Sequence, residues 1–171
     1  ETLRGIPGAD PQAREAVLRH WDSLAKPLGS LGGLEEAVTK IGALTGDAAV
    51  RLDQRVLFVL CADNGVIAQG VTQSDESVTR AVTTSLGQGT STVNFMAAQA
   101  GCQVVPVDLG VRDFPGAPGV LSRRVRNGTA DISQGPAMTR AECIQAMETG
   151  ISLAREAQGK GASTLLMGEM G

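Results

Sequence analysis

Three short apolar runs stand out along the chain, and each ends at an acidic residue beside or close to glycine. The runs lie within residues 56–65, 104–110 and 164–171, and their acids are Asp63, Asp108 and Glu169. Buried parallel strands are covered on both faces, so they are continuously hydrophobic and do not alternate with polar residues. Open α/β sheets bind ligands just beyond the carboxyl ends of their strands. The pattern therefore predicts three parallel strands that bring acidic side chains to one sheet edge.

Helical periodicity is found before the first run and between the first two. Asp10 followed by proline is typical of a helix start, and apolar residues then recur at helical spacing over 17–24 and again over 34–44. Two further helices are expected over 74–87 and 93–100. Because a parallel strand pair needs a crossover connection, helices at this place fit an α/β fold.

The segment 112–136 is different, being rich in Pro, Gly, Asn and Arg with little periodicity. We expect it to form a long excursion over the sheet edge, with a solvated basic face at Arg123, Arg124 and Arg126. Thr139 and Glu142 then have the spacing of a capping box, which predicts a helix that ends at Gly159.

Composition excludes several classes of protein. The net charge is -3, aromatic residues make up 2% of the chain, and basic residues do not cluster in runs, so nucleic acid is not an expected partner. The three cysteines lack zinc-site spacing and are expected to be reduced core thiols, and no metal site is predicted. No apolar stretch has the length of a membrane span or of a signal peptide. These features predict a cytoplasmic protein that does not contact membranes.

Six sequence strings occur in the order found in one enzyme family. These strings are KPLGSLGGLE at 26–35, CADNGV at 61–66 with GV at 70–71, VT at 78–79, VDLGV at 107–111, GPAM at 135–138 and GEMG at 168–171. On these strings, the chain from Pro7 to Gly171 resembles the nicotinate-nucleotide:dimethylbenzimidazole phosphoribosyltransferases.

The resemblance implies a reaction and a fold. A base such as 5,6-dimethylbenzimidazole would attack the anomeric carbon of nicotinate mononucleotide, nicotinate would leave, and an α-riboside 5′-phosphate would form for cobamide (vitamin B12) assembly. The base must lose a proton and the ribosyl centre must carry positive charge, and carboxylates can meet both demands without a cofactor. The implied fold is a Rossmann-like parallel sheet flanked by helices, with residues 1–46 belonging to a small helical domain and 47–171 forming the first half of the α/β domain.

The resemblance also implies an assembly and an incomplete chain. Members of the family are generally homodimers with sites near the subunit interface. Their usual catalytic base is a glutamate that would lie beyond Gly171. Because the third apolar run has no helix after it, we expect this chain to be part of a longer protein.

Several residues are candidates for the site. Glu169 is expected to support the reacting centre, because by resemblance Gly168, Glu169 and Gly171 begin the loop that holds the ribose and phosphate. Ser74 aligns with a serine of the base pocket, but it would equally serve as a helix N-cap. Asp63 is a candidate for substrate binding or for a tight turn, whereas we expect Asp108 to support a turn.

Two positions differ from the usual family sequence. Asn64 stands where histidine is common, and a carboxamide cannot exchange protons near neutral pH, so a hydrogen-bonding role is expected. Val82 stands where a glutamine faces the base in well-studied members. Loss of that donor makes another base plausible, such as a purine, another benzimidazole or a phenol.

Two functions other than phosphoribosyl transfer are compatible with an α/β fold. A dinucleotide-dependent oxidoreductase would share the α/β pattern, but no strand is followed by a Gly-x-Gly-x-x-Gly sequence. The stronger alternative is a non-catalytic protein or a subunit of a heteromer, which would bind the nucleotide or the base without completing the active site.

Overall fold

The computed structural model describes residues 2–171. The chain divides into two compact units, residues up to Arg51 and residues from Leu52 onward, and each is described by itself. The division lies a few residues after the boundary predicted between 46 and 47. Assignment of the first unit to a small helical domain stays a prediction.

The first unit is helical. It contains a short 3-10 helix η1 (Thr2–Gly5) and the helices α1 (Pro11–Ser23) and α2 (Gly33–Thr45). The Asp10 carboxylate accepts hydrogen bonds from the first backbone N–H groups of α1, with Oδ1 2.7 Å from the nitrogen of Gln12. This N-cap confirms the helix start predicted from the Asp-Pro pair.

The loop between α1 and α2 is closed by a partly buried ion pair. Lys26 Nζ lies 2.8 Å from Glu35 Oε1 and 5.4 Å from the centre of the Trp21 ring. The hydrogen bond from Lys26, together with one from the backbone of Leu31, holds the pKa of Glu35 below its usual range. The first and last residues of the string at 26–35 therefore stabilise a loop.

The second unit is built on a sheet of four parallel strands in the order β3-β2-β1-β4. Its strands are β1 (Arg55–Ala62), β2 (Cys102–Gly110), β3 (Leu121–Ser122) and β4 (Thr164–Met170). The three predicted strands are confirmed. The sequence pattern did not reveal the two-residue strand β3, which is too short to show a period.

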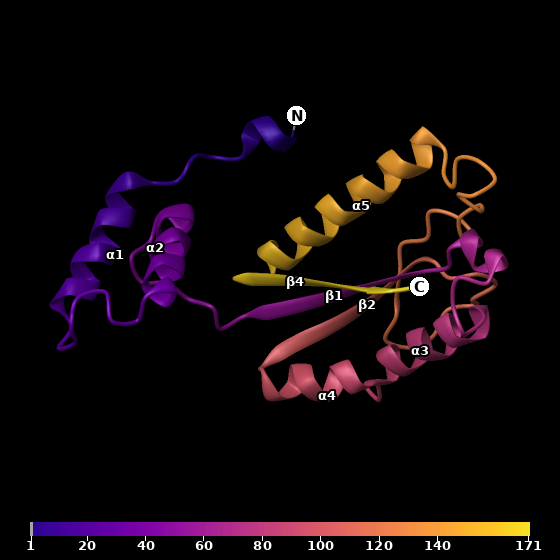
Figure 1. Ribbon diagram of the computed structural model, residues 1–171, viewed down its shortest axis with the longest axis horizontal. Coiled ribbons are helices and arrows are strands. Elements are labelled where there is room, and N and C mark those ends of the chain that lie inside the picture. The colour runs from indigo at the N-terminus through magenta and orange to yellow at the C-terminus, as the bar shows by residue number, and fades with distance from the viewer. Residues whose placement is uncertain (1) are drawn as a thin grey trace. The chain divides into compact units, whose positions relative to one another are not determined.

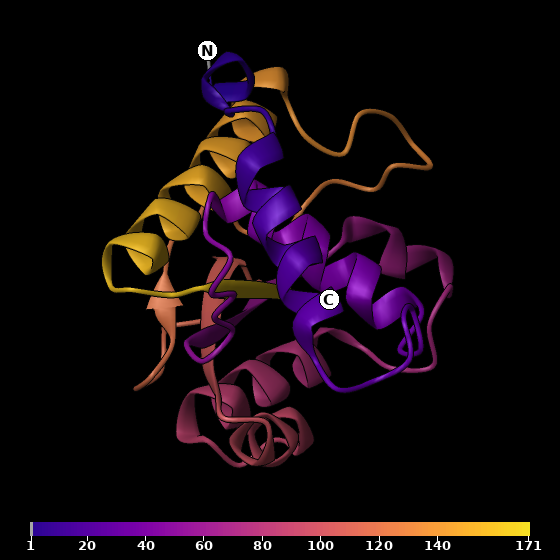
Figure 2. The same ribbon diagram turned by 90° about the vertical axis from the view of Figure 1, so that its left-hand side faces the viewer.

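Helices cover both faces of this sheet. They are α3 (Glu76–Gln88), α4 (Thr92–Gln99) and α5 (Arg140–Gly159), and a 3-10 helix η2 (Gly65–Gln69) follows β1. Figure 1 and Figure 2 show α5 on one side of the strands and α3 and α4 on the other. The α/β class and the parallel sheet predicted for the chain are confirmed.

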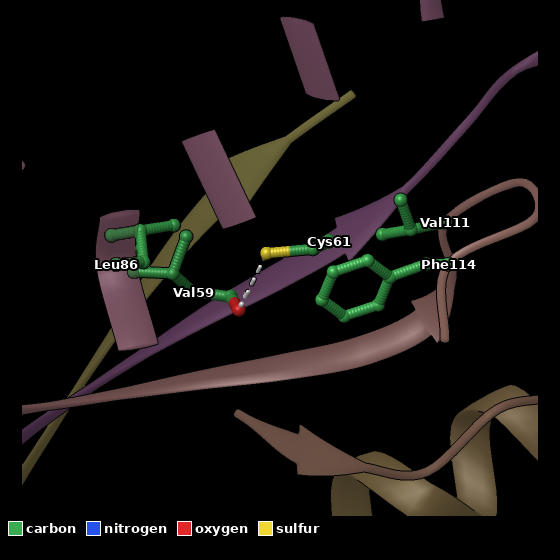
Figure 3. Close-up of a cluster of buried hydrophobic side chains, with 5 residues drawn as sticks. All are labelled: Val59, Cys61, Leu86, Val111 and Phe114. Carbon is green, nitrogen blue, oxygen red and sulfur yellow. Dashed lines mark hydrogen bonds between the residues drawn. The ribbon is translucent and has the colours of Figure 1, made fainter. Parts of the chain in front are cut away.

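Alternate residues of β1 contribute to two hydrophobic clusters, one on each face of the sheet. Phe58 packs with residues of α5 on one face, while Val59 and Cys61 pack with Leu86 of α3 on the other. Figure 3 shows the second cluster, in which Phe114 from the segment after β2 also takes part. A strand that is buried on both sides explains why its sequence does not alternate.

Burial of the Cys61 thiol is expected to make the unfolding free energy depend on pH. Its side chain is fully buried, and burial raises the pKa of the thiol above the usual value of 9.0. Above about pH 9 the unfolded chain loses this proton while the folded chain retains it, so the unfolding free energy should decrease as pH rises.

Urea unfolding between pH 7 and 10 measures this dependence. We expect Cys61→Ala to reduce the decrease in unfolding free energy above pH 9, whereas Cys143→Ala, at an exposed thiol, should leave it unchanged. Equal slopes for the native chain and Cys61→Ala would contradict the assignment.

The irregular segment after β2 is held against the carboxyl ends of the strands. Backbone hydrogen bonds join Thr129 to Asp63, at 2.9 Å, and Gly128 to Gly110, at 3.0 Å. These contacts confirm the predicted excursion over the sheet edge.

The prediction of a solvated basic face in this segment is wrong for Arg124 and Arg126, whereas Arg123 forms an exposed ion pair with Glu156. Arg124 forms an ion pair with the buried Asp108, and Arg126 forms one with Glu142 at the start of α5. These arginines are partly buried because they neutralise acids that the sheet and α5 bring to the same place.

Candidate active site

The three acids at the strand ends differ in what they bind. Asp108 is buried, and its Oδ1 accepts a hydrogen bond from the backbone of Val111 at 2.8 Å while its Oδ2 lies 2.9 Å from Arg124 Nη2. Both carboxylate oxygens of Asp108 therefore accept hydrogen bonds from other residues of the chain. This confirms the prediction that Asp108 supports a turn.

One carboxylate oxygen of Asp63 accepts a hydrogen bond, and the residue lines a pocket. It is 2% exposed, and its Oδ2 accepts a hydrogen bond of 2.6 Å from the backbone nitrogen of Arg112. The Arg112 side chain in turn forms an ion pair of 3.2 Å with Glu76, in the first turn of α3. Asp63 therefore sits where β1, the excursion and α3 meet, and neither Arg112 nor Glu76 had been singled out from the sequence.

A cavity of about 150 Å³ lies at this end of the sheet. Its wall combines polar and aliphatic side chains from the turn after β1, the start of α3 and the end of β4. The lining residues are Asp63, Asn64, Val66, Ile67, Val71, Thr72, Ser74, Asp75, Val78, Thr79, Met170 and Gly171. Val66, Val71 and Val78 belong to strings that carry the family resemblance, but the sequence did not indicate that these side chains line a site.

Ser74 lines this cavity, and Asp75 is the residue that caps α3. Asp75 Oδ1 accepts a hydrogen bond of 2.8 Å from the nitrogen of Ser77, whereas the Ser74 hydroxyl shares one with Thr72 at 3.2 Å. Hydrogen bonds from Ser77 hold the pKa of Asp75 below its usual range. The capping alternative for Ser74 is wrong, because the helix begins one residue later.

The turn after β1 is fixed by close backbone packing at Gly65. A Cβ atom on Gly65 would lie 2.6 Å from the carbonyl carbon of Ala130 and 2.7 Å from the nitrogen of Asp131. The nitrogen of Gly65 also donates to the Thr129 hydroxyl at 3.1 Å. Only glycine fits here, which explains its place after Asp63 and Asn64.

Glu169 lies on β4 opposite Leu60, close to the cavity and exposed. A Cβ atom built on Gly171 would lie 2.8 Å from Glu169 Oε1, so this carboxylate lies beside Gly171 without being part of the cavity lining. The cavity lining itself includes the acids Asp63 and Asp75 and no basic residue. The described site is therefore acidic.

Two predicted site residues lie elsewhere. Val82 is half-buried and packs against the cluster of Figure 3, outside the cavity lining. Gly168 is in the middle of β4, where it pairs with Val59. A role for either in substrate binding stays a prediction.

Larger cavities lie both next to this one and away from it. Those of about 210 and 550 Å³ adjoin it, because the first shares Asn64 with its lining and the second shares Ser74 and Asp75. One of about 310 Å³ is found at the amino ends of the strands, where Arg55, Glu156 and Lys160 contribute to its wall. Because open α/β sheets bind ligands at the carboxyl ends of strands, we assign the site to the smaller cavity beside Asp63.

Metal sites and membrane-spanning helices are two further features that a chain can carry. Among residues 4–171 no group of three or more histidine, cysteine or acidic side chains is arranged to hold a metal ion. Within the described part of the chain, no helix combines the length and hydrophobicity that crossing a bilayer requires.

Comparison with known proteins identifies the family. A family model described as "Phosphoribosyltransferase" matches residues 6–171. The chain belongs to this phosphoribosyltransferase family. Two relatives, from Acetivibrio thermocellus and Chloroflexus aggregans, are 41% and 42% identical to it. Both are named nicotinate-nucleotide--dimethylbenzimidazole phosphoribosyltransferase, and the matches cover 100% of this chain but 49% of each relative.

A solved structure agrees with the family assignment. The crystal structure of CobT from Thermus thermophilus is 38% identical to the chain, with a TM-score of 0.88. The match covers 94% of this chain and 49% of that one. The chain thus spans about half the length of the relatives it matches, and the predicted resemblance to this family is confirmed. The assignment to their N-terminal half stays a prediction.

Proposed function

We propose that this chain contributes to the transfer of a phosphoribosyl group from nicotinate mononucleotide to dimethylbenzimidazole or a related base. In this reaction a base nitrogen bonds to C1′ of the ribose, and the bond from C1′ to nicotinate breaks. Its electron pair goes to the nicotinate nitrogen, and the base loses its N–H proton. The product, an α-riboside 5′-phosphate, would serve cobamide assembly.

The acidic cavity at the strand ends is the observation that carries this proposal. Asp63 and Asp75 line it, Glu169 lies beside the lining residue Gly171, and the lining has no basic residue. The pyridinium ring of the nucleotide is cationic, and the ribosyl centre gains positive charge as nicotinate leaves. Acidic groups placed before the reaction favour both charges, because they need no reorganisation.

The base is proposed to bind against the aliphatic wall of the same cavity. Val71, Val78 and Ile67 offer apolar contact, while Ser74 supplies a hydroxyl. Asp63 and Asp75 already accept backbone hydrogen bonds, so we infer that the proton acceptor is a glutamate outside residues 1–171, as the family resemblance implies.

A reaction assay tests the proposal. The chain would be joined to the remaining half of the Acetivibrio thermocellus relative, and nicotinate mononucleotide would be mixed in turn with dimethylbenzimidazole, adenine and phenol. We expect an α-riboside phosphate from at least one base, detected by mass spectrometry. If the relative is active and the folded chimera gives no product with any base, the proposal is wrong.

The alternative of a non-catalytic or heteromeric subunit predicts another outcome. The chain would then bind nicotinate mononucleotide or a base in isothermal titration, while the folded chimera would form no product. Isothermal titration and the product assay together therefore distinguish the two functions.

Assembly as a homodimer and a cytoplasmic location are also proposals. The family resemblance supports the first, and the three free cysteines, which suit a reducing compartment, support the second. Analytical ultracentrifugation of the chimera tests the dimer.

Gly171→Ala provides a test of the end of the cavity. The added methyl group would clash with the backbone oxygen of Ala62 and would lie 2.8 Å from Glu169 Oε1 and 2.9 Å from Asn64 Nδ2, so the end of β4 and both side chains must move. Displacement of groups near a reacting centre by about 1 Å can cost about 100-fold in rate, and we expect a decrease of about 10- to 100-fold in the chimera.

The matched control is Gly150→Ala. Nothing lies within 4 Å of a Cβ atom at Gly150, which is exposed on α5. It should keep full activity, and its unfolding free energy should rise by about 0.5–1 kcal/mol, as for alanine in a helix. Full activity of Gly171→Ala would contradict the placement of the site.

A further inference from the structure

Arg112 joins the segments that form the cavity, although it does not line the cavity itself. Its backbone nitrogen donates to Asp63 Oδ2 at 2.6 Å, and its Nη2 donates to the backbone oxygen of Thr129 at 3.3 Å. Its Nη1 lies 3.2 Å from Glu76 Oε1, in the first turn of α3. One residue therefore connects the turn after β1, the excursion and the start of α3.

The Arg112 guanidinium is held closely on the side of the excursion. Arg112 Nε is buried, and a Cβ atom on Gly128 would lie 2.9 Å from it. Thr129 accepts the hydrogen bond from Arg112 and also binds the turn after β1, because its hydroxyl accepts from the nitrogen of Gly65 at 3.1 Å. Arg112 thus presents its charge to α3 from a fixed position.

The partner of this charge, Glu76, belongs to the part of α3 that helps to form the cavity wall. Two residues before it and two after it line the cavity, namely Ser74, Asp75, Val78 and Thr79. Another part of the lining comes from the turn after β1, which Arg112 holds through its bonds to Asp63 and Thr129. The ion pair therefore links two segments of the cavity wall.

Within the described part of the chain, this ion pair is the one long-range polar contact of residues 72–80. The other hydrogen bonds of this segment are local, such as those from Ser77 to Asp75 and between Thr72 and Ser74. Local bonds fix the shape of a helix start, whereas its position relative to the sheet needs contacts from elsewhere. Among polar contacts, that task falls to Glu76 and Arg112.

We propose that Arg112 is a positioning residue for the acceptor base. Through Glu76 it fixes the place of Ser74 and Val78, and thereby the space that the cavity offers to the base. This inference rests on the proposed function and extends it to the choice of base. Because dimethylbenzimidazole is neutral, the ion pair acts on it through the shape of the cavity, and a fixed wall distinguishes bases that differ by methyl groups.

Base selectivity in the chimera tests the inference. Arg112→Ala, Glu76→Ala and the double substitution are assayed with benzimidazole and dimethylbenzimidazole at saturating nicotinate mononucleotide. We expect each single substitution to raise KM for dimethylbenzimidazole about 10-fold and to change kcat less than about 3-fold. The ratio of kcat/KM for the two bases should move toward one by at least about 3-fold. The double substitution should raise KM about 10-fold and not about 100-fold, because both changes break the same contact.

Two further variants serve as controls. Arg112→Lys keeps a cation for Glu76 and should raise KM less than about 3-fold. Arg123→Ala removes an ion pair of similar length, 3.3 Å, that joins the excursion to α5 away from the cavity, and it should leave both KM values unchanged. Urea unfolding verifies that each variant is folded. Glu76→Gln, which keeps the shape of the side chain, replaces any alanine variant that is not.

Three results would overturn the inference while leaving the proposed function in place. They are unchanged KM values, a loss confined to kcat and equal for both bases, and independent losses that multiply in the double variant. If the folded chimera forms no product, isothermal titration of dimethylbenzimidazole gives a separate readout. Weaker binding by Arg112→Ala but not by Arg123→Ala would then uphold the inference and overturn only the proposed function, whereas equal or absent binding would overturn both.

Discussion

Glu169→Gln is expected to lower the rate of phosphoribosyl transfer by about 100-fold, which corresponds to about 3 kcal/mol of transition-state stabilisation. Glutamine has nearly the same shape as glutamate, so the substitution removes the negative charge and retains the bulk. Charge at this place matters because the ribosyl centre is more positive in the transition state than in the bound nucleotide. The loss should therefore lie mainly in kcat, with a smaller change in KM.

The measurement is the initial rate in the chimera, with Glu148→Gln as the matched control. Glu148 is exposed on α5 and has no described ion-pair partner, so its substitution should not change the rate. Since Glu169 is also exposed and packs little, both variants should unfold at the same urea concentration. An unchanged rate for Glu169→Gln would show that this carboxylate does not take part in the reaction.

Asp108→Ala is expected to lower the unfolding free energy by about 3 kcal/mol. The substitution leaves the backbone nitrogen of Val111 without its acceptor and the Arg124 guanidinium without its anion. Breaking a buried pair from one side costs about 3–5 kcal/mol, and the partial exposure of Arg124 places this case at the lower end. Urea unfolding with an unchanged m-value would measure the loss.

The adjacent ion pair provides the control for this prediction. Arg123 and Glu156 lie 3.3 Å apart, and both side chains are more than a third exposed, so Glu156→Gln should cost no more than about 0.5 kcal/mol. Because Asp108 does not line the cavity, Asp108→Ala should bind nicotinate mononucleotide normally while it stays folded. Equal losses for the two variants would mean that burial does not distinguish these pairs.

Local sequence rules accounted for the regular elements. Asp10 caps α1, and the Thr139-Glu142 pair forms the capping box of α5, because each motif is satisfied by atoms within three residues. The strands were found from continuous apolar runs for a similar reason: burial on both faces imposes its own composition. Local rules are not sufficient where two neighbouring residues can both cap a helix. Ser74 and Asp75 are both residue types that favour the N-cap of α3, but only Asp75 occupies it, while the Ser74 hydroxyl pairs with Thr72.

The role of each acid at the strand ends depended on residues far away in the sequence. Asp63 and Asp108 both end apolar runs near glycine, yet the first lines the cavity and the second is enclosed. The difference arises because Arg124 comes from the excursion after β2, a segment whose irregular path carries no periodic signal. The lack of a periodic signal is also why the sequence alone predicts solvated arginines in this segment.

The sequence by itself determined the α/β class, the three long strands, the family and the sheet edge at which we propose the site, since apolar runs, caps and motif strings are local properties of the chain. Only the tertiary structure decided which acids remain available to a ligand. Arg124 from the excursion and the backbone of Val111 occupy Asp108, and the backbone of Arg112 occupies one oxygen of Asp63, whereas Glu169 has no described hydrogen-bond partner. The availability of an acid depends on the partners that folding brings within about 3 Å, and those partners are distant in sequence.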